Sequence, residues 1–339
     1  MEKIGKTGIV FMFAVFCVFS AIPVSAQENN PAETQSLKVE IAEGGQVLQQ
    51  VSTLEDEMIG YIDWENNVVY AVGDGVPPEK AVSPAQARVR AKRAAIDTAM
   101  ARLLETIKEV RVDSESTTRN YINEHHVVHT QVSGFVKNAV IEELRQAEDG
   151  SYQIKMSMPI NGDRGLSAAL LPFEMRKVGI VTRVVREQKA PVKKQNSVNI
   201  PETKQTAAVS PETAAVASEA AEAEAPPVYT GLIINAKGLN ASPGMYPNIR
   251  TGSGKVIYNI SVADPNASVS EGLCAYRKAL EQARKIDSLG DSPLLVKAVE
   301  VDGKNRIDLI IEDSDGEKII RADIQSSFLK EARVAVVID

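Results

Sequence analysis

The stretch SPAQARVRAKRAAIDTAMARLLETIKEV, residues 83–110, predicts the helix around which the first half of this chain is built. Ser83 is a suitable N-cap, Pro84 favours the first helical turn, and Gln86 completes an S-x-x-Q capping box. Alanines within the stretch keep the helix thin, so that it can lie close against a sheet. Larger apolar side chains recur at helical spacing and predict one buried stripe, made of Val89, Ile96, Met100, Leu103, Leu104 and Ile107.

Strand patterns precede this helix. Residues 58–64 and 68–73 are rich in β-branched and aromatic side chains, and the turn composition at 65–67 between them predicts a hairpin. The following segment, 73–78, contains two glycines and two prolines and is expected to break the second strand before the helix begins.

Further strands follow the helix. Together with the hairpin they predict an α+β domain over residues 37–176, in which an antiparallel sheet is packed by the long helix in two layers. The expected elements are a short strand at 110–112, a helix or mixed segment at 117–133, strands at 135–145 and 151–159, and a short helix at 166–175.

The composition changes in the middle of the chain. Residues 187–227 are rich in Ala, Glu and Pro and have neither an aromatic residue nor a periodic apolar face, which predicts a disordered linker between two independently moving domains. Residues 228–339 are expected to form a second two-layer α+β domain of the same kind. Its expected elements are strands at 230–239, 255–262, 293–301, 306–313 and 332–339, the last of them central, and helices at 270–289 and 315–331.

The N-terminus has the pattern of a cleavable secretory signal. Lys3 and Lys6 precede an apolar run over 8–22, and the small residues that end at Ala26 predict a signal peptide over 1–26. The run is shorter than the roughly twenty residues that a membrane span requires, so we expect a periplasmic protein with no transmembrane segment in the mature chain. A formal net charge of -7 argues against nucleic-acid binding, which requires clustered excess cations.

The three histidines of the chain, His125, His126 and His129, lie within five residues. On one helix, His125 and His129 would face the same side and could bind Zn²⁺. An HExxH motif is missing, so the general base of a zinc protease is not present. A polar, exposed helix face is the simpler interpretation, and a zinc-binding periplasmic protein is the alternative function.

Other candidate motifs favour structural roles. Gly252-Ser253-Gly254-Lys255 lacks the spacing of a phosphate-binding loop and predicts a hairpin turn, while the acidic run at 312–317 favours a solvated turn over a Ca²⁺ loop. Cys274 is the single cysteine left after signal cleavage, and we expect a small buried side chain on a helix. No catalytic, cofactor-binding or metal-binding residue is assigned, and no enzyme is expected.

Two kinds of surface remain as binding candidates. Small α+β sheets commonly leave an open edge that can accept a partner strand. The first half of the long helix also carries a basic face that could meet an acidic partner or an anionic envelope polymer, with ordinary solvated charge as the alternative; it contains Arg88, Arg90, Lys92 and Arg93.

Three motifs occur in a familiar order. GYIDWENNVVYAVGDGVPP (60–78) is followed by A-x-x-A-A-x-x-x-A-x-x-x-L-L from Ala91 to Leu104, and then by G-x-Y-x-I-x-M-x-M-P from Gly150 to Pro159. Over about residues 58–160 the chain resembles the LPP-twenty lipoprotein family and the N-terminal domain of flagellar assembly protein T. The resemblance implies a non-catalytic envelope domain, attached in some members to the outer membrane or to the flagellar basal-body rings. We therefore expect a binding or assembly module whose partners are envelope or flagellar-base proteins.

Overall fold

The computed structural model describes residues 46–52, 58–179 and 227–339. The predicted signal peptide (1–26) and all but the last residue of the predicted linker (187–227) lie outside the described residues. The α+β class expected from the sequence is confirmed. The described strands form two sheets, one in an N-terminal module that ends at residue 179 and one in a C-terminal module that begins at residue 227.

The N-terminal module is built on an antiparallel sheet of five strands. The predicted hairpin is confirmed, and Asn67 in its turn has a positive φ of 56°, a conformation that Asn tolerates well. On the last strand of the module, Ile154 and Met156 lie on one face and are buried. In spatial order the strands are β1 (Leu48–Ser52), β2 (Met58–Asp63), β3 (Val68–Gly75), β5 (Tyr152–Pro159) and β4 (Val140–Gln146).

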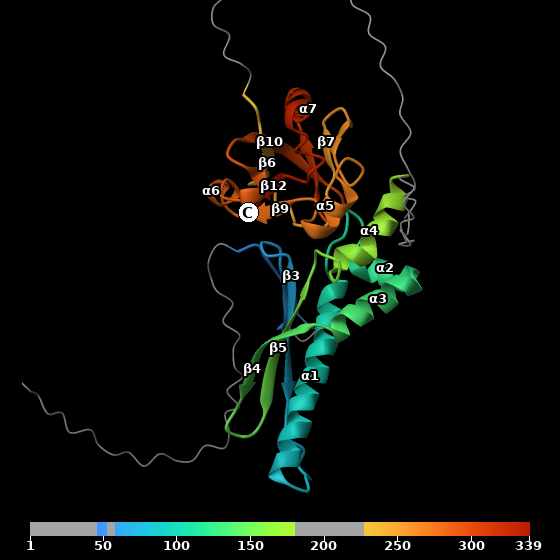
Figure 1. Ribbon diagram of the computed structural model, residues 1–339, viewed down its shortest axis with the longest axis vertical. Helices are drawn as coiled ribbons and strands as arrows, with labels where there is room; N and C mark the ends of the chain where they lie inside the picture. Colours follow the sequence, from blue (N-terminus) through green and yellow to red (C-terminus); the bar gives the residue numbers. More distant parts are fainter. Residues whose placement is uncertain (1–45, 53–57, 180–226) are drawn as a thin grey trace, which may run out of the picture. The chain divides into compact units, whose positions relative to one another are not determined.

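Helix α1 (Pro84–Lys108) runs along this sheet, beside β3 and β5 (Figure 1). Its predicted start is confirmed, because Ser83 Oγ accepts a hydrogen bond from the Gln86 N–H at 3.2 Å. Gln86 Oε1 in turn accepts one from the Val82 N–H at 2.8 Å. These two bonds satisfy backbone donors that a helix start otherwise leaves without partners.

The buried face of α1 differs from the predicted stripe. Leu103 and Ile107 are fully buried as expected, but Val89 is 68% exposed, and the other three predicted residues are only partly buried. Alanines take their places, because the helix lies too close to the sheet for larger side chains. The buried residues of α1 are Ala91, Ala95, Ala99, Leu103, Thr106 and Ile107.

Two glycines of β3 allow this close approach. A Cβ atom placed on Gly73 would lie 2.2 Å from the Ala99 nitrogen, and one on Gly75 would lie 2.1 Å from the Ala91 carbonyl oxygen. Backbone therefore packs directly on backbone at this contact. The strand ends within the predicted segment 73–78, as expected. The break falls after Gly75, before the prolines, because β3 continues through both glycines and uses them as its contact with the helix.

Three shorter helices complete the N-terminal module. The predicted short strand at 110–112 is only a single bridge between Arg111 and Thr117. The strand predicted at 135–145 begins later, at Val140, because the preceding helix continues through Lys137. The predicted helix at 166–175 is confirmed. The helices are α2 (Thr118–Glu124), α3 (His126–Lys137) and α4 (Leu166–Lys177).

The C-terminal module contains a sheet of seven strands that is largely parallel. The expected antiparallel arrangement is therefore wrong for this module. The runs 232–234 and 334–337 are uninterrupted apolar and buried, a pattern typical of parallel strands covered on both faces. In spatial order the strands are β8 (Val256–Tyr258), β7 (Ile249–Thr251), β11 (Asp308–Ile311), β10 (Pro293–Asp302), β6 (Gly231–Asn235), β12 (Val334–Val337) and β9 (Ala275–Arg277).

The helix predicted at 270–289 is also wrong. Gly272 has a φ of 85° and follows the helical residues, and Tyr276 then pairs with Val336 of the interior strand β12. The apolar spacing of this segment fits a helix, but pairing with β12 outweighs that local preference. The predicted helix at 315–331 is present with shifted ends. The helices of this module are α5 (Pro265–Ser270), α6 (Leu280–Ala283), the 3₁₀ helix η1 (Asp287–Leu289) and α7 (Asp313–Ser326).

The two modules contact each other within the unit Glu43–Asp339. The Tyr246 N–H donates to the Val112 carbonyl at 2.8 Å, and Arg277 forms an ion pair with Glu65 at 3.3 Å. Both charged side chains of that pair are about one-fifth exposed, so solvent screens it less than a surface pair.

Replacing Gly73 tests the backbone contact between β3 and α1. We expect Gly73→Ala to lower the free energy of unfolding by about 3 kcal/mol or more, because its Cβ overlaps backbone atoms that cannot rotate away. Gly134→Ala, inside α3, is the matched control: its Cβ meets no atom within 4 Å, so we expect a gain of about 0.5–1 kcal/mol. Denaturant unfolding measures both, and a Gly73→Ala protein as stable as the wild type would contradict the packing described.

Candidate functional site

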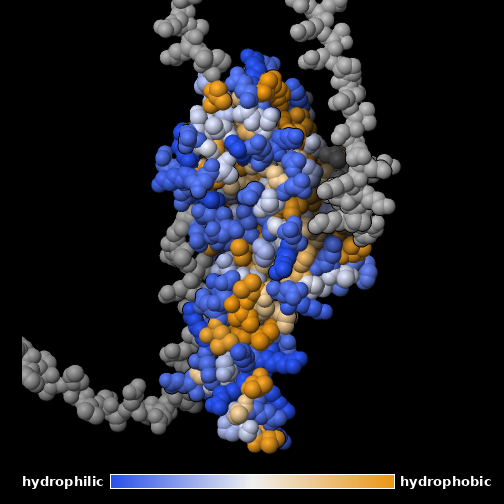
Figure 2. Space-filling model, viewed as in Figure 1, coloured by the Kyte–Doolittle hydropathy of each residue, from blue (hydrophilic) through white to orange (hydrophobic). Residues whose placement is uncertain are grey.

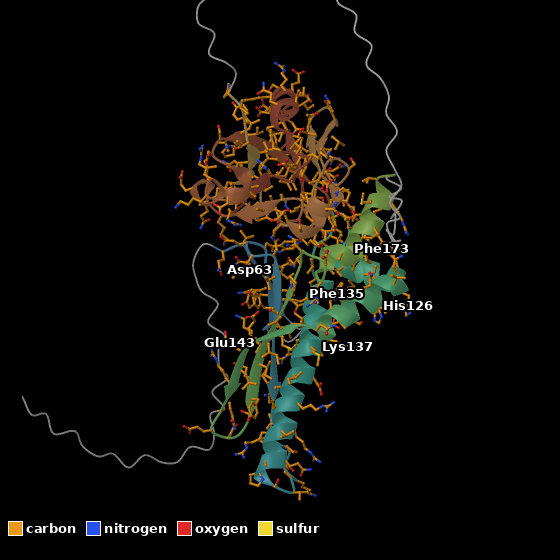
Figure 3. The ribbon with its side chains drawn as sticks, in the orientation of Figure 1. Asp63, His126, Phe135, Lys137, Glu143 and Phe173 are labelled. Carbon is orange, nitrogen blue, oxygen red and sulfur yellow. The ribbon has the colours of Figure 1, made fainter. Side chains whose placement is uncertain are left out.

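The structure separates His125 from the other two histidines that the sequence places beside it. His125 lies between α2 and α3 in an extended conformation, and its ring stacks on Phe173 of α4 with centroids 4.3 Å apart. His126 and His129 are exposed on α3, with ring centroids 6.2 Å apart. Figure 3 labels His126 and Phe173 on these helices. His125 and His129 therefore do not share a helix face, and the described residues contain no group of three His, Cys, Asp or Glu residues placed to hold a metal ion.

Three other sequence candidates occupy structural positions. The segment at 252–255 is the predicted turn, between β7 and β8, and Ser253 Oγ donates to Asp313 at 2.6 Å. Asp313 and Asp315 begin α7, so the acidic run is a helix start instead of the expected turn. Carboxylates at this end of a helix are favoured by its dipole.

Cys274 is buried, as expected, but it precedes β9 and is not part of a helix. Burial raises the pKa of its thiol to about 12. Since the thiolate is the reactive form of cysteine, this side chain is unsuited to nucleophilic chemistry.

A partly buried polar cluster, which sequence analysis did not predict, connects the loop after α1 with α2 and α4. It consists of Asp113, Tyr121, Glu174 and Lys177. Lys177 Nζ lies 2.7 Å from Asp113 Oδ2 and 3.1 Å from Glu174 Oε1. The Tyr121 hydroxyl donates to Glu174 and also lies 3.2 Å from Asp113 Oδ2. The one hint in the sequence is that Glu174 and Lys177 are three residues apart in a helix whose surroundings are apolar.

Glu174 carries the largest cost of burial in this cluster. It is 5% exposed, and desolvation raises its pKa to about 7, against the opposing effect of Lys177. Desolvation lowers the pKa of Lys177, but its hydrogen bond to Asp113 and the charge of Glu174 raise it overall. The cluster is therefore a network of mutually satisfied charges in which Glu174 can take up a proton near neutral pH.

The C-terminal module contributes a tyrosine near this network. The Tyr246 side chain is 3% exposed, and its hydroxyl has no hydrogen-bond partner among the described residues. Its pKa is raised, first by desolvation and then by the negative charge of Glu174. The Tyr246 hydroxyl therefore stays protonated, and the nearby Glu174 carboxylate opposes its ionisation.

The most exposed strand of the N-terminal sheet is β4. It is an edge strand whose neighbour is β5, and all of its residues are exposed. Val140, Ile141 and Leu144 are 57%, 43% and 43% exposed, which is high for apolar side chains of a strand. Figure 2 shows a hydrophobic patch over the part of the molecule where Figure 1 labels β4 and β5.

The two faces of β4 differ in chemistry. Ile141 and Leu144 lie opposite Met156 and Ile154 of β5, on the face that α1 covers over β3 and β5. Glu143 and Arg145 lie on the other face and form an ion pair at 2.7 Å. Glu143 is labelled on β4 in Figure 3. An open edge with one apolar and one charged face can accept a strand of matching pattern.

The basic half of α1 is solvated. Arg88, Arg90, Lys92 and Arg93 are all exposed. Arg93 lies 4.0 Å from Asp97, one turn along the helix, and both side chains are mostly exposed. A pair of this kind contributes little to stability. This surface is consistent with the ordinary solvated charge that was the alternative expectation.

Comparison with known proteins found a similarity for one of the two modules. Residues 231–339 match the family described as the second domain of Treponema pallidum Tp0624. This match covers the C-terminal module and does not bear on the resemblance noted for residues 58–160, which stays a prediction. No curated protein matches the chain. None of the helices in the described ranges combines the length and the apolar character needed to cross a membrane.

Replacing Glu174 tests the buried network through the pH dependence of stability. Because the pKa of Glu174 is raised to about 7 from 4.5, the folded state binds its proton more tightly than the unfolded state, and stability falls as pH rises between these values. We expect the free energy of unfolding of Glu174→Gln, relative to wild type, to rise by up to about 3 kcal/mol between pH 4.5 and pH 8.

Denaturant unfolding at several pH values measures this difference. Glu317→Gln is the control, because the Glu317 side chain is 66% exposed and carries no comparable burial cost. Parallel stability curves for wild type and Glu174→Gln would show that Glu174 does not take up a proton in this range.

Proposed function

We propose that this protein is a non-catalytic envelope module that assembles with protein partners through the open edge of β4. The observation that carries the proposal is an edge strand exposed along its whole length, with apolar side chains on one face and a Glu–Arg pair on the other. Edge strands in native proteins are usually protected, so a persistent apolar edge marks an interaction site.

The proposed location of the protein in the cell envelope is based on the sequence. The signal pattern at 1–26 supports export, and the resemblance of 58–160 supports a periplasmic protein that works with envelope or flagellar-base components, some of them at the outer membrane. The match of 231–339 to the second domain of Treponema pallidum Tp0624 concerns the other module and assigns no partner.

The non-catalytic part of the proposal has a physical basis. In this network, Glu174 is ion-paired to Lys177 on the same helix and accepts a hydrogen bond from Tyr121, which holds α4 to α2. A general acid or base must instead present its proton to a bound substrate. Side chains whose hydrogen bonds and ion pairs are all made with one another stabilise the fold and have no group left to act on a substrate.

Blocking the edge tests this function. We expect the double variant Ile141→Lys and Leu144→Lys to lose most of the envelope proteins that the wild-type chain retains after crosslinking in periplasmic and outer-membrane fractions. Charges on the apolar face of β4 would be buried by a partner strand without compensation. Flagellar ring proteins among the lost partners would indicate that the protein works in assembly of the flagellar base.

Ile324→Lys on α7 is the matched control. Ile324 is 77% exposed and lies in the C-terminal module, so we expect its replacement to leave the captured set unchanged. Equal capture by the wild type and the β4 variant would show that the edge is not the binding surface.

A further inference from the structure

We propose that the strand that pairs with β4 is β4 of a second copy of this chain, antiparallel and related by a two-fold axis through Leu144. The inference rests on the proposed function, because it names the partner of the same edge. It follows from the charge pattern of β4 and from the register of β4 on β5. Such a dimer would extend the sheet continuously from one copy into the other.

The charges of β4 select the register. A two-fold axis perpendicular to the sheet places Leu144 opposite Leu144, and Glu143 of each copy opposite Arg145 of the other. Opposite charges at directly facing positions stabilise an antiparallel pair. An axis through Glu143 would instead place two carboxylates face to face, and like charges at facing positions are destabilising. The axis through Leu144 therefore forms two contacts between Glu143 of one copy and Arg145 of the other, one on each side of the axis.

The apolar side chains agree with this register. Leu144 and Ile141 lie on the same face of the sheet, opposite Ile154 and Met156 of β5. Each is 43% exposed in one copy. The axis through Leu144 places the two Leu144 side chains against each other, while the two Ile141 side chains lie on the same face but roughly 20 Å apart. Both Glu143–Arg145 pairs lie on the other face. Self-association thus buries Leu144 of both copies and leaves the charged face at the surface.

The bulge in β4 limits how far the pairing extends. The register on β5 shifts between Ile141 and Glu143, so Glu142 is the extra residue. From Glu143 to Gln146 the register is regular. The shared segment is short, and we expect a concentration-dependent equilibrium between monomer and dimer in place of a permanent dimer.

A cysteine crosslink tests the register. In the proposed dimer the two Leu144 Cα atoms lie about 5 Å apart, within the range that a disulfide spans. We expect Leu144→Cys to form a disulfide-linked dimer under mild oxidation. Val140→Cys is the matched control on the same strand: Val140 is more exposed, at 57%, but its two copies would be roughly 25 Å apart.

The wild-type protein is the second control, since Cys274 is buried. A crosslink at Val140 equal to that at Leu144, or none at Leu144, would overturn the register proposed.

Charge exchange tests the pairing independently. Arg145→Glu alone and Glu143→Arg alone place like charges at two positions of the dimer, so we expect each to raise the dimer dissociation constant by about tenfold. The double variant restores opposite charges at both positions and should recover most of the association. Light scattering after size-exclusion chromatography measures the equilibrium over a concentration series, and circular dichroism confirms that each variant is folded.

The outcomes separate the two proposals. A protein that stays monomeric at all concentrations, together with loss of envelope partners in the Ile141→Lys and Leu144→Lys variant, would overturn the self-pairing and leave the edge as a site for a foreign strand. A monomer whose partners are unaffected by that variant would overturn both. Dimers that are insensitive to the charge exchanges would place the self-association at another surface and overturn the inference.

Discussion

The N-terminal module depends on one close contact, where the backbone of α1 lies against the backbone of β3. Gly73 and Gly75 leave no side chains between the two elements, and Ala91, Ala95 and Ala99 supply only methyl groups from the helix. This geometry fixes the distance between the two layers. Larger side chains enter the interface only toward the end of the helix, at Leu103 and Ile107, where both are fully buried.

The contact also determines which part of the sheet remains open. A narrow helix placed over β3 and β5 covers the middle of the sheet. Ile141 and Leu144 of β4 point to the same face, but they remain 43% exposed at the edge. The apolar edge is therefore a consequence of packing one thin helix on a five-stranded sheet. The sheet would need a second layer element, or a partner strand, to bury it.

The sequence predicted local structure well where one signal determined it. The capped start of α1, the hairpin turn at 65–67, and the presence of β5 all follow from residue types at short range. The prediction of local structure failed where contacts between distant parts of the chain determine the conformation. The glycines of β3 were interpreted as part of the strand break, because glycine has that meaning in isolation and acquires its packing role only when a helix approaches.

The C-terminal module shows the same limit. Tyr276 fits a helical spacing but pairs with β12, and no local pattern reveals a parallel partner distant in the sequence. The buried network could not be predicted either, since Asp113 and Glu174 become neighbours only through the fold. The histidine cluster was the reverse case: His125 is separated from His126 and His129, its neighbours in sequence, because a helix boundary falls at His125.

The edge strand illustrates how one set of residues can serve two physical purposes. Glu142, Glu143 and Arg145, together with the bulge, oppose indiscriminate pairing of β4 with any exposed strand, as charges on edge strands generally do. Because these charges are of both signs and closely spaced, they also distinguish one pairing register from its neighbours. A purely apolar β4 would bind more tightly but would accept many registers and many partners. The mixture of apolar and charged residues lowers the affinity of pairing but restricts it to one register, and an assembly module requires one defined register.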